Sequence, residues 1–245
     1  MICLKKIVLL CSVLILFILP TKVSAEENGF KLTCDGNVNN YTTIYEAVKN
    51  AVSKTSCIIE AYEDIHMDKS ITIDANYDIT IDGKNHNIMY ANTSSNTWYT
   101  GQLFNVKSNG QLKLLDLVID GNNNYSFDIE SYNNDLHNSV KVTDVMKYVV
   151  PEPNKPSITS TLISNSGTLI VKDSTIKNIY TAKSASIISA SSNSTTTYDN
   201  SIIKNCFSNG SGLAVNANGA SSRIFIEGDT LIDNNYIASN GGIFK

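Results

Sequence analysis

Three aspartates recur at similar places in the sequence and are its clearest candidates for chemistry. Asp116, Asp173 and Asp229 each follow an alternating aliphatic segment, so a regular fold would stack them as a column of carboxylates. Two carboxylates at a suitable separation can hydrolyse a glycosidic bond. Aspartate also begins and caps bends, and we favour this structural interpretation. We therefore predict no catalytic residue.

Other groups that would assist such acids are scarce. The histidines His66, His86 and His137 are scattered, and the sole arginine is Arg223. The cysteines and histidines lack Cys-x-x-Cys or His-x-x-x-His spacing, so we predict no metal site and no cofactor. A lysine base acting with calcium stays open as an alternative.

The first 25 residues have the features of an export signal. Lys5 and Lys6 precede an apolar run of about 13 residues, Ile7 to Leu19, and small residues follow at 23–25. The run is shorter than the ~20 residues that cross a bilayer. We therefore expect cleavage rather than an uncleaved anchor, and no membrane span beyond this segment. Removing residues 1–25 changes the formal net charge from −4 to −7. An acidic, arginine-poor chain is a poor candidate for binding nucleic acid or polyanionic sugars.

Three cysteines remain after such a cleavage, namely Cys34, Cys57 and Cys206. Export permits a disulfide. Cys34 and Cys57 flank an expected helix and could bridge strand to strand. The alternative is that all three are small buried hydrophobic residues.

A repeated pattern of short strands and turns organises most of the chain. Each copy has an aliphatic strand, a Gly, Ser or Asn turn, a second alternating strand and a polar bend. The copies begin 25, 26 and 30 residues apart, at Leu162, Ile187, Leu213 and Ile243. An earlier copy, at Leu103, precedes Leu162 by 59 residues. Such a period is typical of a solenoid rather than of an immunoglobulin-like sandwich. We expect asparagine to be structural in the bends, at Asn178, Asn205 and Asn235.

An amphipathic helix is expected near the amino terminus, over about residues 41–54. Thr43 and Glu46 form a capping box. One apolar stripe runs through Ile44, Ala47, Val48, Ala51 and Val52. The helix is expected between a strand at 30–34 with a turn at 35–40, and a strand at 58–62. Two short strands should follow, at 71–73 and 79–81.

Three of these segments carry a resemblance to a known family: YTTIYEAVKNAV (Tyr41–Val52), CIIEAYEDI (Cys57–Ile65) and ITIDGKNHNI (to Ile88). They resemble the amino-terminal end of right-handed parallel β-helix proteins of the pectin-lyase-like class, in particular bacterial surface proteins. The resemblance implies an all-β solenoid over residues 26–245, as one domain whose helix plugs the open end. Family hydrolases carry an adjacent Asp-Asp pair, which this sequence lacks. Because the last copy stops one strand after it begins, we expect the chain to be the N-terminal part of a longer protein.

An insertion over about residues 123–160 separates two copies, and a shorter one spans residues 90–100. Insertions on a solenoid often carry binding specificity, and their aromatic rings could stack on a sugar or pack locally. The candidate binding residues are Trp98, Tyr99, Tyr125, Phe127 and Tyr132. We expect an exported, non-catalytic, adhesin-like protein, secreted or at the cell surface. Its partner would be an extracellular glycan or a surface protein of a host or neighbouring cell. The alternative is a polysaccharide lyase or glycoside hydrolase with an unrecognised site.

Overall fold

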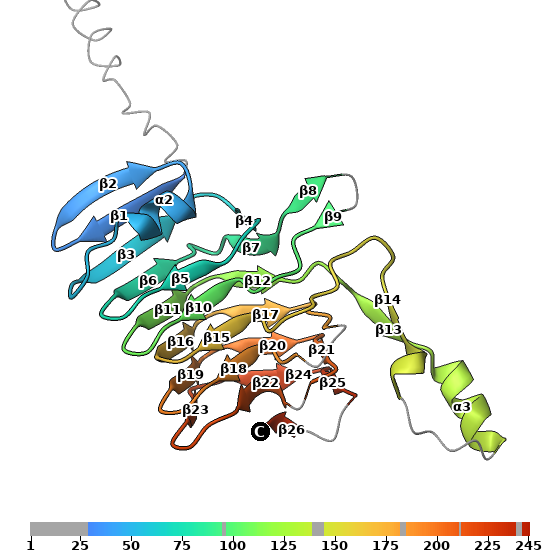
Figure 1. Ribbon diagram of the computed structural model, residues 1–245. Coiled ribbons are helices and arrows are strands. Elements are labelled where there is room, and N and C mark those ends of the chain that lie inside the picture. Colours follow the sequence, from blue (N-terminus) through green and yellow to red (C-terminus); the bar gives the residue numbers. More distant parts are fainter. Residues whose placement is uncertain (1–28, 95–96, 139–144, 182–184, 211, 239–241) are drawn as a thin grey trace, which may run out of the picture.

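The computed structural model describes residues 29–94, 97–138, 145–181, 185–210, 212–238 and 242–245. The leader expected over residues 1–25 lies outside these ranges. Within them, most strands belong to three sheets, A, B and C, whose strands stack along the length of the molecule (Figure 1). Among the helices described, none is long and apolar enough to cross a membrane.

In each of the three sheets, neighbouring strands of the described part of the chain are hydrogen-bonded in the following order. Sheet A consists of β2 (Asn37–Tyr41), β1 (Phe30–Cys34), β3 (Ser56–Ala61), β6 (Asp78–Asp82), β11 (Gln111–Leu115), β16 (Thr168–Lys172), β19 (Thr195–Asp199) and β23 (Arg223–Glu227). Sheet B consists of β4 (Ile65–Met67), β7 (Asn87–Tyr90), β12 (Val118–Asp120), β17 (Thr175–Lys177), β20 (Ile202–Lys204) and β24 (Leu231–Asp233). Sheet C consists of β5 (Ile71–Ile73), β10 (Phe104–Val106), β15 (Ile163–Asn165), β18 (Ile188–Ala190), β22 (Gly212–Ala217) and β26 (Gly242–Phe244).

The chain visits the three sheets repeatedly in the same order, C then A then B. One repeat is therefore a set of three strands, such as β10, β11 and β12. Each strand pairs in parallel with the matching strand of the next repeat, so that Ile79, Leu112 and Leu169 lie side by side in sheet A. The strands β1 and β2 at one edge of sheet A pair in antiparallel fashion instead. The all-β class with parallel strands, predicted from the sequence, is confirmed.

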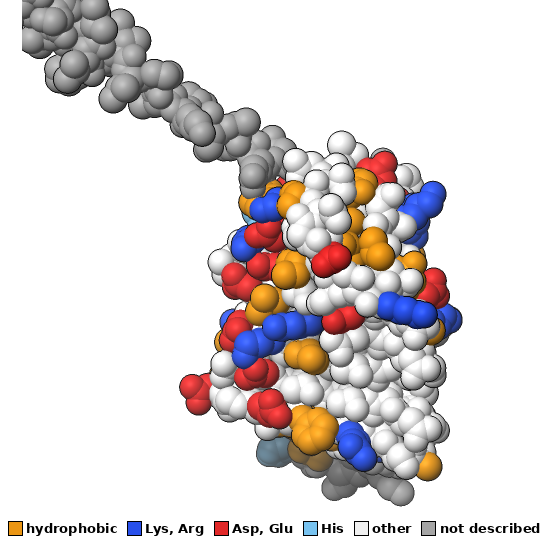
Figure 2. All heavy atoms as spheres, turned by 90° about the vertical axis from the view of Figure 1, so that its left-hand side faces the viewer, with side chains coloured by type: hydrophobic (Ala, Val, Ile, Leu, Met, Phe, Trp, Pro, Cys, Tyr) orange, Lys and Arg blue, Asp and Glu red, His pale blue; other side chains and the backbone are white. Residues whose placement is uncertain are grey.

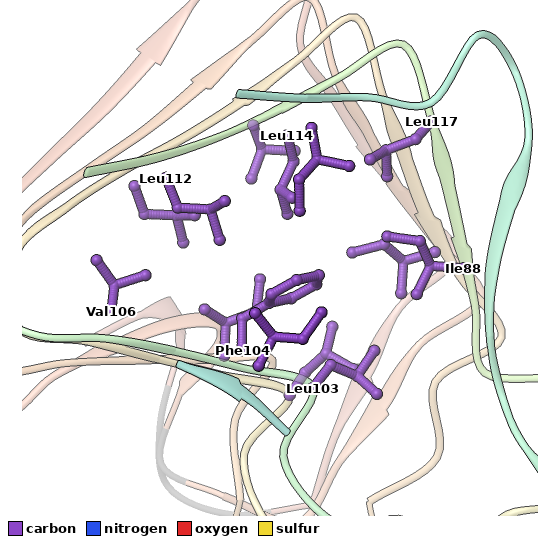
Figure 3. Close-up of a cluster of buried hydrophobic side chains, with 14 of the residues drawn as sticks. Ile88, Leu103, Phe104, Val106, Leu112, Leu114 and Leu117 are labelled. Carbon is purple, nitrogen blue, oxygen red and sulfur yellow. The ribbon is translucent and has the colours of Figure 1, made fainter. Parts of the chain in front are cut away.

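Alternating aliphatic side chains build one core between the three sheets. In a strand, successive side chains point to opposite faces, and the inward residues of all three sheets belong to one buried cluster. Figure 3 shows Leu112 and Leu114 of sheet A facing Phe104 and Val106 of sheet C, with Ile88 of sheet B at the side. Each of these five residues is completely buried. Because each repeat places similar residues at the same positions, the core continues from repeat to repeat.

The corner between sheets A and B requires left-handed backbone. The residues at this position have φ between 47° and 57° in four successive repeats, and they are Asp116, Asp173, Asn200 and Gly228. Asp, Asn and Gly adopt this conformation at the lowest energy. The predicted column of Asp116, Asp173 and Asp229 is therefore wrong at its last member, because Asp229 lies one residue beyond the corner. The first two aspartates do shape a bend, as expected.

The corner after sheet B follows the same rule. Asn178, Asn205 and Asn234 have φ of 54°, 53° and 48°. The sequence predicted Asn235 in place of Asn234. The structural role of asparagine holds, and the position is off by one residue. Asn235 instead uses its amide to bond the neighbouring repeat, where its Oδ1 accepts from the Cys206 N–H at 2.8 Å.

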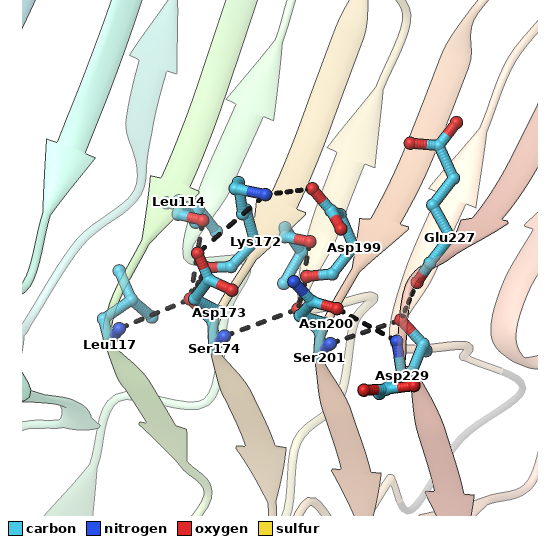
Figure 4. Close-up of polar contacts among 12 residues, drawn as sticks. Leu114, Leu117, Lys172, Asp173, Ser174, Asp199, Asn200, Ser201, Glu227 and Asp229 are labelled. Atoms are coloured by element: carbon cyan, nitrogen blue, oxygen red, sulfur yellow. Dashed lines mark hydrogen bonds and ion pairs between the residues drawn. The ribbon is translucent and has the colours of Figure 1, made fainter.

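Stacked hydroxyl groups hold consecutive repeats together next to the first corner (Figure 4). The Ser201 hydroxyl donates to the Val171 carbonyl at 3.0 Å and accepts from the Ser174 N–H at 3.4 Å. The Ser174 hydroxyl in turn accepts from the Leu117 N–H at 3.3 Å. Ser174 and Ser201 are buried. Each hydroxyl therefore bonds backbone groups of a neighbouring repeat.

The amino-terminal helix α2 (Ile44–Lys49) is shorter than the predicted span of 41–54. Thr43 caps it by accepting from the Glu46 N–H at 3.2 Å. The Glu46 carboxylate accepts from the Thr42 hydroxyl at 3.0 Å. Within the predicted apolar stripe, Ile44, Ala47 and Ala51 are buried. Val52 is 51 % exposed and does not belong to the stripe, because the helix has ended before it.

Cys34 and Cys57 form a disulfide, with sulfur atoms 2.08 Å apart. They lie opposite each other on the antiparallel pair β1 and β3. Cys206 is a buried free thiol. The segment Asp35–Asn40 was predicted as a turn. Most of it is instead strand β2, which folds back on β1 as a hairpin. The asparagines that suggested a turn occupy the outer edge of sheet A.

The spacing of the repeats also needs one correction. Ile187 is the residue before Ile188, which pairs with Val215, so the position equivalent to Ile187 is Ala214 and not Leu213. The register of β22 with the following strand β26 also shifts, between Gly212 and Val215.

Two hairpins project from the stacked strands on the right of Figure 1. The first is β8 (Asn92–Ser94) with β9 (Thr97–Trp98). The second belongs to the insertion and pairs β13 (Tyr125–Phe127) with β14 (Val149–Pro151). Between these two strands come α3 (Ile129–His137) and the 3-10 helix η1 (Val145–Tyr148). A further short parallel pair, β21 (Phe207–Ser208) with β25 (Tyr236–Ile237), lies next to the insertion (Figure 1).

Candidate functional site

The insertion leaves the stacked repeats at Asn123. Asp120 pairs with Lys177 in the next repeat. Asn123 lies three positions after Asp120, and Tyr180 lies three positions after Lys177. Asn123 and Tyr180 therefore occupy equivalent positions in their repeats. The buried Asn123 side chain donates to the Pro156 carbonyl at 2.8 Å and accepts from the Glu152 N–H at 3.2 Å. One amide therefore ties the departing strand to the returning strand, and this contact fixes the base of the insertion.

Three aromatic residues occupy the position of Asn123 in the following repeats. Tyr180 forms a bridge with Phe207, and Phe207 pairs with Tyr236. The rings of Tyr180 and Phe207 stack with centroids 5.1 Å apart. Because these strands pair in register, their rings form a column on the outside of the repeats.

The hairpin of the insertion packs its own rings against this column. Tyr125 lies 5.7 Å from Phe207 and 5.8 Å from Tyr236, between ring centroids. Phe127 lies 6.1 Å from Tyr236, and their ring planes are almost parallel at 7°. The Tyr125 hydroxyl donates to the Cys206 carbonyl at 3.0 Å. Burial raises the pKa of this hydroxyl well above its ordinary value, so it stays a hydrogen-bond donor at neutral pH.

The hairpin and the two last ring-bearing repeats enclose a cleft of about 240 Å³. The residues that line it are Asn124, Tyr125, Phe127, Asn205, Asn234 and Tyr236. Tyr236 is 42 % exposed, so part of its ring is open to solvent. The Asn234 amide donates to Asn205 Oδ1 at 2.6 Å. The cleft therefore combines aromatic surfaces with amide groups, as many small-molecule sites do.

The far part of the insertion supports the cleft from behind. The Tyr132 ring on α3 lies 5.4 Å from Phe127 and 5.3 Å from Tyr148. Asp128 caps α3 by accepting from the Ser131 N–H at 3.0 Å. The Asp135 carboxylate accepts hydrogen bonds from Lys147 and from the Tyr148 hydroxyl. These two bonds hold the pKa of Asp135 below its usual range. Tyr132 thus positions Phe127 and does not line the cleft.

Of the five binding residues predicted from the sequence, the structure brings Tyr125, Phe127 and Tyr132 together. Trp98 and Tyr99 are elsewhere, on and after the β8–β9 hairpin. The Trp98 indole N–H donates to the Asn154 carbonyl at 2.9 Å. The Tyr99 hydroxyl donates to the Gln102 carbonyl at 2.6 Å, and its ring lies 6.0 Å from that of Tyr90. Trp98 therefore bonds the returning part of the insertion, and Tyr99 has partners close to it in the sequence.

The sequence-based prediction missed Asn124, Asn234 and Tyr236, and it gave Asn205 a structural role rather than a place in a sugar site. A signal for Asn205, Asn234 and Tyr236 is present in the repeats. At the corner after sheet B, three left-handed asparagines are each followed two residues later by an aromatic residue, in Asn178-Ile-Tyr180, Asn205-Cys-Phe207 and Asn234-Asn-Tyr236. Because a residue two positions past a bend returns to the same place in every repeat, this pattern indicates an external aromatic column.

Acidic groups gather mainly with basic groups, on sheet A and near it. Lys31 and Lys84 form ion pairs with Glu60 at 2.7 and 3.0 Å. Lys172 pairs with Asp199, and its Nζ lies 3.9 Å from Asp173 Oδ2 (Figure 4). Figure 2 shows basic and acidic side chains beside one another on one side of the molecule. The bond to Asp199 raises the pKa of Lys172, so this lysine is a poor proton acceptor at neutral pH.

Two of the three histidines lie near oxygen atoms of other residues. His86 Nδ1 lies 3.5 Å from Asp64, and His137 Nδ1 lies 3.3 Å from the Asn133 carbonyl. Among the described residues, no group of three or more His, Cys, Asp or Glu side chains is placed to hold a metal ion. Comparison of the sequence and structure with protein families, with curated proteins and with solved structures found no match.

Proposed function

We propose that the chain folds as a right-handed parallel β-helix of the pectin-lyase-like class, with α2 covering its amino-terminal end. The support is the fixed order of sheets C, A and B, with parallel pairing in register from one repeat to the next. Right-handed connections between parallel strands are strongly preferred. Ile44 and Ala47 of α2 are buried in the same cluster as the inward residues of the sheets, as a covering helix requires.

On this scaffold we propose a non-catalytic, adhesin-like role in which the protein is exported and binds an extracellular glycan. The observation that carries the proposal is the cleft of Tyr125, Phe127 and Tyr236 with the amides of Asn205 and Asn234. A sugar ring has an apolar face of C–H groups and a rim of hydroxyls. Aromatic rings can pack on the face, and amides can both donate to and accept from the rim.

The alternative of a polysaccharide lyase or hydrolase has less support. A lyase needs a proton acceptor, and the clearest lysine near carboxylates, Lys172, is held in its charged form by Asp199. A hydrolase needs two carboxyl groups with different protonation states. Asp116 and Asp173 occupy backbone corners, where their position is explained by conformation.

Export and glycan binding can be tested separately. Cell fractionation of the producing organism should place the protein outside the cytoplasm, with residues 1–25 removed. Recovery of full-length protein in the cytoplasm would contradict export.

For binding, the purified protein should be screened against immobilised plant, microbial and animal glycans, together with Tyr236→Ala. The matched control is Phe225→Ala, because Phe225 is 43 % exposed and lies on sheet A away from the cleft. We expect Tyr236→Ala to abolish binding and Phe225→Ala to retain it. Equal binding by both variants would refute the site. The release of reducing ends or unsaturated uronates from a bound glycan would refute the non-catalytic role.

A further inference from the structure

The cleft next to the insertion has no charged side chain among the described residues that line it. The nearest charges along the chain are Asp128, Lys204 and Asp233, each one residue away from a lining residue. The Asp128 carboxylate caps α3, and Lys204 and Asp233 come one residue before Asn205 and Asn234. Those two residues pair across neighbouring strands and have opposite signs. Recognition of a carboxylate or sulfate group in proteins relies on charged donors, above all arginine. An anionic sugar would lose hydration in this cleft without gaining such a partner.

The size of the cleft limits the ligand further. Its volume of about 240 Å³ is below the ~300–1,000 Å³ that is usual for sites of drug-sized molecules. The hairpin of the insertion bounds one side and the column of rings bounds another, so the space suits one six-membered sugar ring. Further sugar units of a chain would extend into solvent.

The aromatic rings give the sugar two apolar walls, one formed by Tyr125 and the other by Phe127 and Tyr236. Tyr125 stands perpendicular to Tyr236, at 90° between ring planes, while Phe127 is nearly parallel to Tyr236. Phe127 is held in turn by Tyr132 and Tyr148. Two walls that are already packed in place lose little side-chain entropy when a ligand binds.

The amides supply a matched donor and acceptor. The Asn234 amide nitrogen is occupied by Asn205 Oδ1. This bond leaves the Asn205 amide nitrogen and Asn234 Oδ1 without a hydrogen-bond partner in the described part of the chain. One can donate to a hydroxyl oxygen and the other can accept from a hydroxyl. Because the bond between the two side chains holds these two atoms near each other, they suit two adjacent hydroxyl groups on one sugar ring.

From these observations we infer that the cleft binds a single neutral pyranose ring through a pair of neighbouring hydroxyl groups. The inference rests on the proposed glycan-binding function and narrows it to uncharged sugars recognised at one ring.

The experiment compares neutral and acidic versions of the same ring. The probes are methyl glucoside, methyl galactoside, methyl mannoside and methyl xyloside, together with methyl glucuronide and methyl galacturonide, titrated into the protein by ligand-observed NMR. At least one neutral glycoside should bind at least tenfold more tightly than either uronide. Its affinity should change less than twofold between 50 and 500 mM NaCl, as expected for contacts without charge, because the Debye length falls from ~14 to ~4 Å over this range.

Two variants locate the binding. Asn234→Gly removes the amide and keeps a left-handed conformation that glycine adopts freely. It should weaken the neutral sugar at least tenfold. Its matched control is Asn178→Gly, which makes the same change at the equivalent position of an earlier repeat, where φ is 54°, and should leave binding unchanged. Circular dichroism and thermal unfolding of each variant verify that it folds.

The outcomes separate the two ideas. Tighter binding of uronides that is lost in Tyr236→Ala overturns the neutral-sugar inference and retains the glycan-binding function. Neutral binding that Asn234→Gly and Asn178→Gly weaken equally overturns the assignment of the hydroxyl pair to Asn205 and Asn234. A protein that binds neither these probes nor any immobilised glycan overturns the proposed function, and the inference with it.

Discussion

Ser201→Ala tests whether the stacked hydroxyls hold the repeats together. Ser201 is completely buried. Its hydroxyl donates to the Val171 carbonyl at 3.0 Å and accepts from the Ser174 N–H at 3.4 Å. The same hydroxyl also lies 3.0 Å from the Asp199 carbonyl, and alanine removes all of these contacts. Leaving a buried backbone group unsatisfied costs about 1–3 kcal/mol, so we expect a loss of ~2 kcal/mol. For a chain of this size that loss lowers Tm by roughly 4–8 °C.

The control is Ser189→Ala, which removes an outward, partly exposed hydroxyl from β18 in the same repeat. Changes at such surface positions usually alter stability by no more than about 0.5 kcal/mol. Thermal unfolding gives Tm, and hydrogen exchange of the Ser174 amide gives a local measure that does not depend on the whole protein unfolding in one step. We expect faster exchange at Ser174 in Ser201→Ala alone. Equal Tm values for the two variants, with Ser174 still protected, would show that the hydroxyls do not stabilise the stack.

Three other predictions concern the cysteines and the ion pairs. Replacing both Cys34 and Cys57 by alanine should lower the free energy of unfolding by about 3 kcal/mol, because the bridge closes a loop with a sequence separation of 23; a change below about 1 kcal/mol in denaturant titration would contradict this. Burial raises the pKa of the Cys206 thiol to about 12, so a thiol reagent at pH 8 should modify it only as fast as the protein unfolds, and rapid labelling of folded protein would be the opposite result. Lys31 and Lys84 hold the pKa of Glu60 below its usual 4.5. The stabilisation that these two ion pairs give is therefore complete above pH 4.5 and is lost as the pH falls through the lower pKa of Glu60 in the folded protein. Glu60→Gln should therefore flatten the decline of Tm below about pH 5 relative to the parent protein.

Much of the fold is predictable from local patterns. Alternation at Ile71–Ile73, Leu112–Leu114 and Leu169–Val171 identifies strands, because inward positions recur every second residue. The recurrence of that pattern identifies the repeats. The positions that the sequence placed wrongly, at Asp229, Asn235 and Leu213, are each off by one residue. At the first corner the property that the repeats share is a left-handed φ, which Asp, Asn and Gly all satisfy, so residue identity does not mark the position.

The candidate site is less predictable for a different reason. Tyr125 and Tyr236 are separated by more than 100 residues, and they meet because the insertion folds back over later repeats. Local patterns give the strand propensity of Tyr125–Phe127. They do not give the direction in which the hairpin packs, which depends on contacts such as the bond from the Tyr125 hydroxyl to the Cys206 carbonyl.

The place where the insertion begins gives a physical reason for the site. The insertion departs at Asn123, at the position where the following repeats carry Tyr180, Phe207 and Tyr236. A chain that leaves the stack there starts directly beside an exposed aromatic column, and its first two aromatic residues pack against that column. Most of the cluster is then buried between the insertion and the repeats, while the end of the column at Tyr236 stays open. The same contacts that stabilise the insertion therefore leave a cleft of aromatic rings and amide groups at its edge.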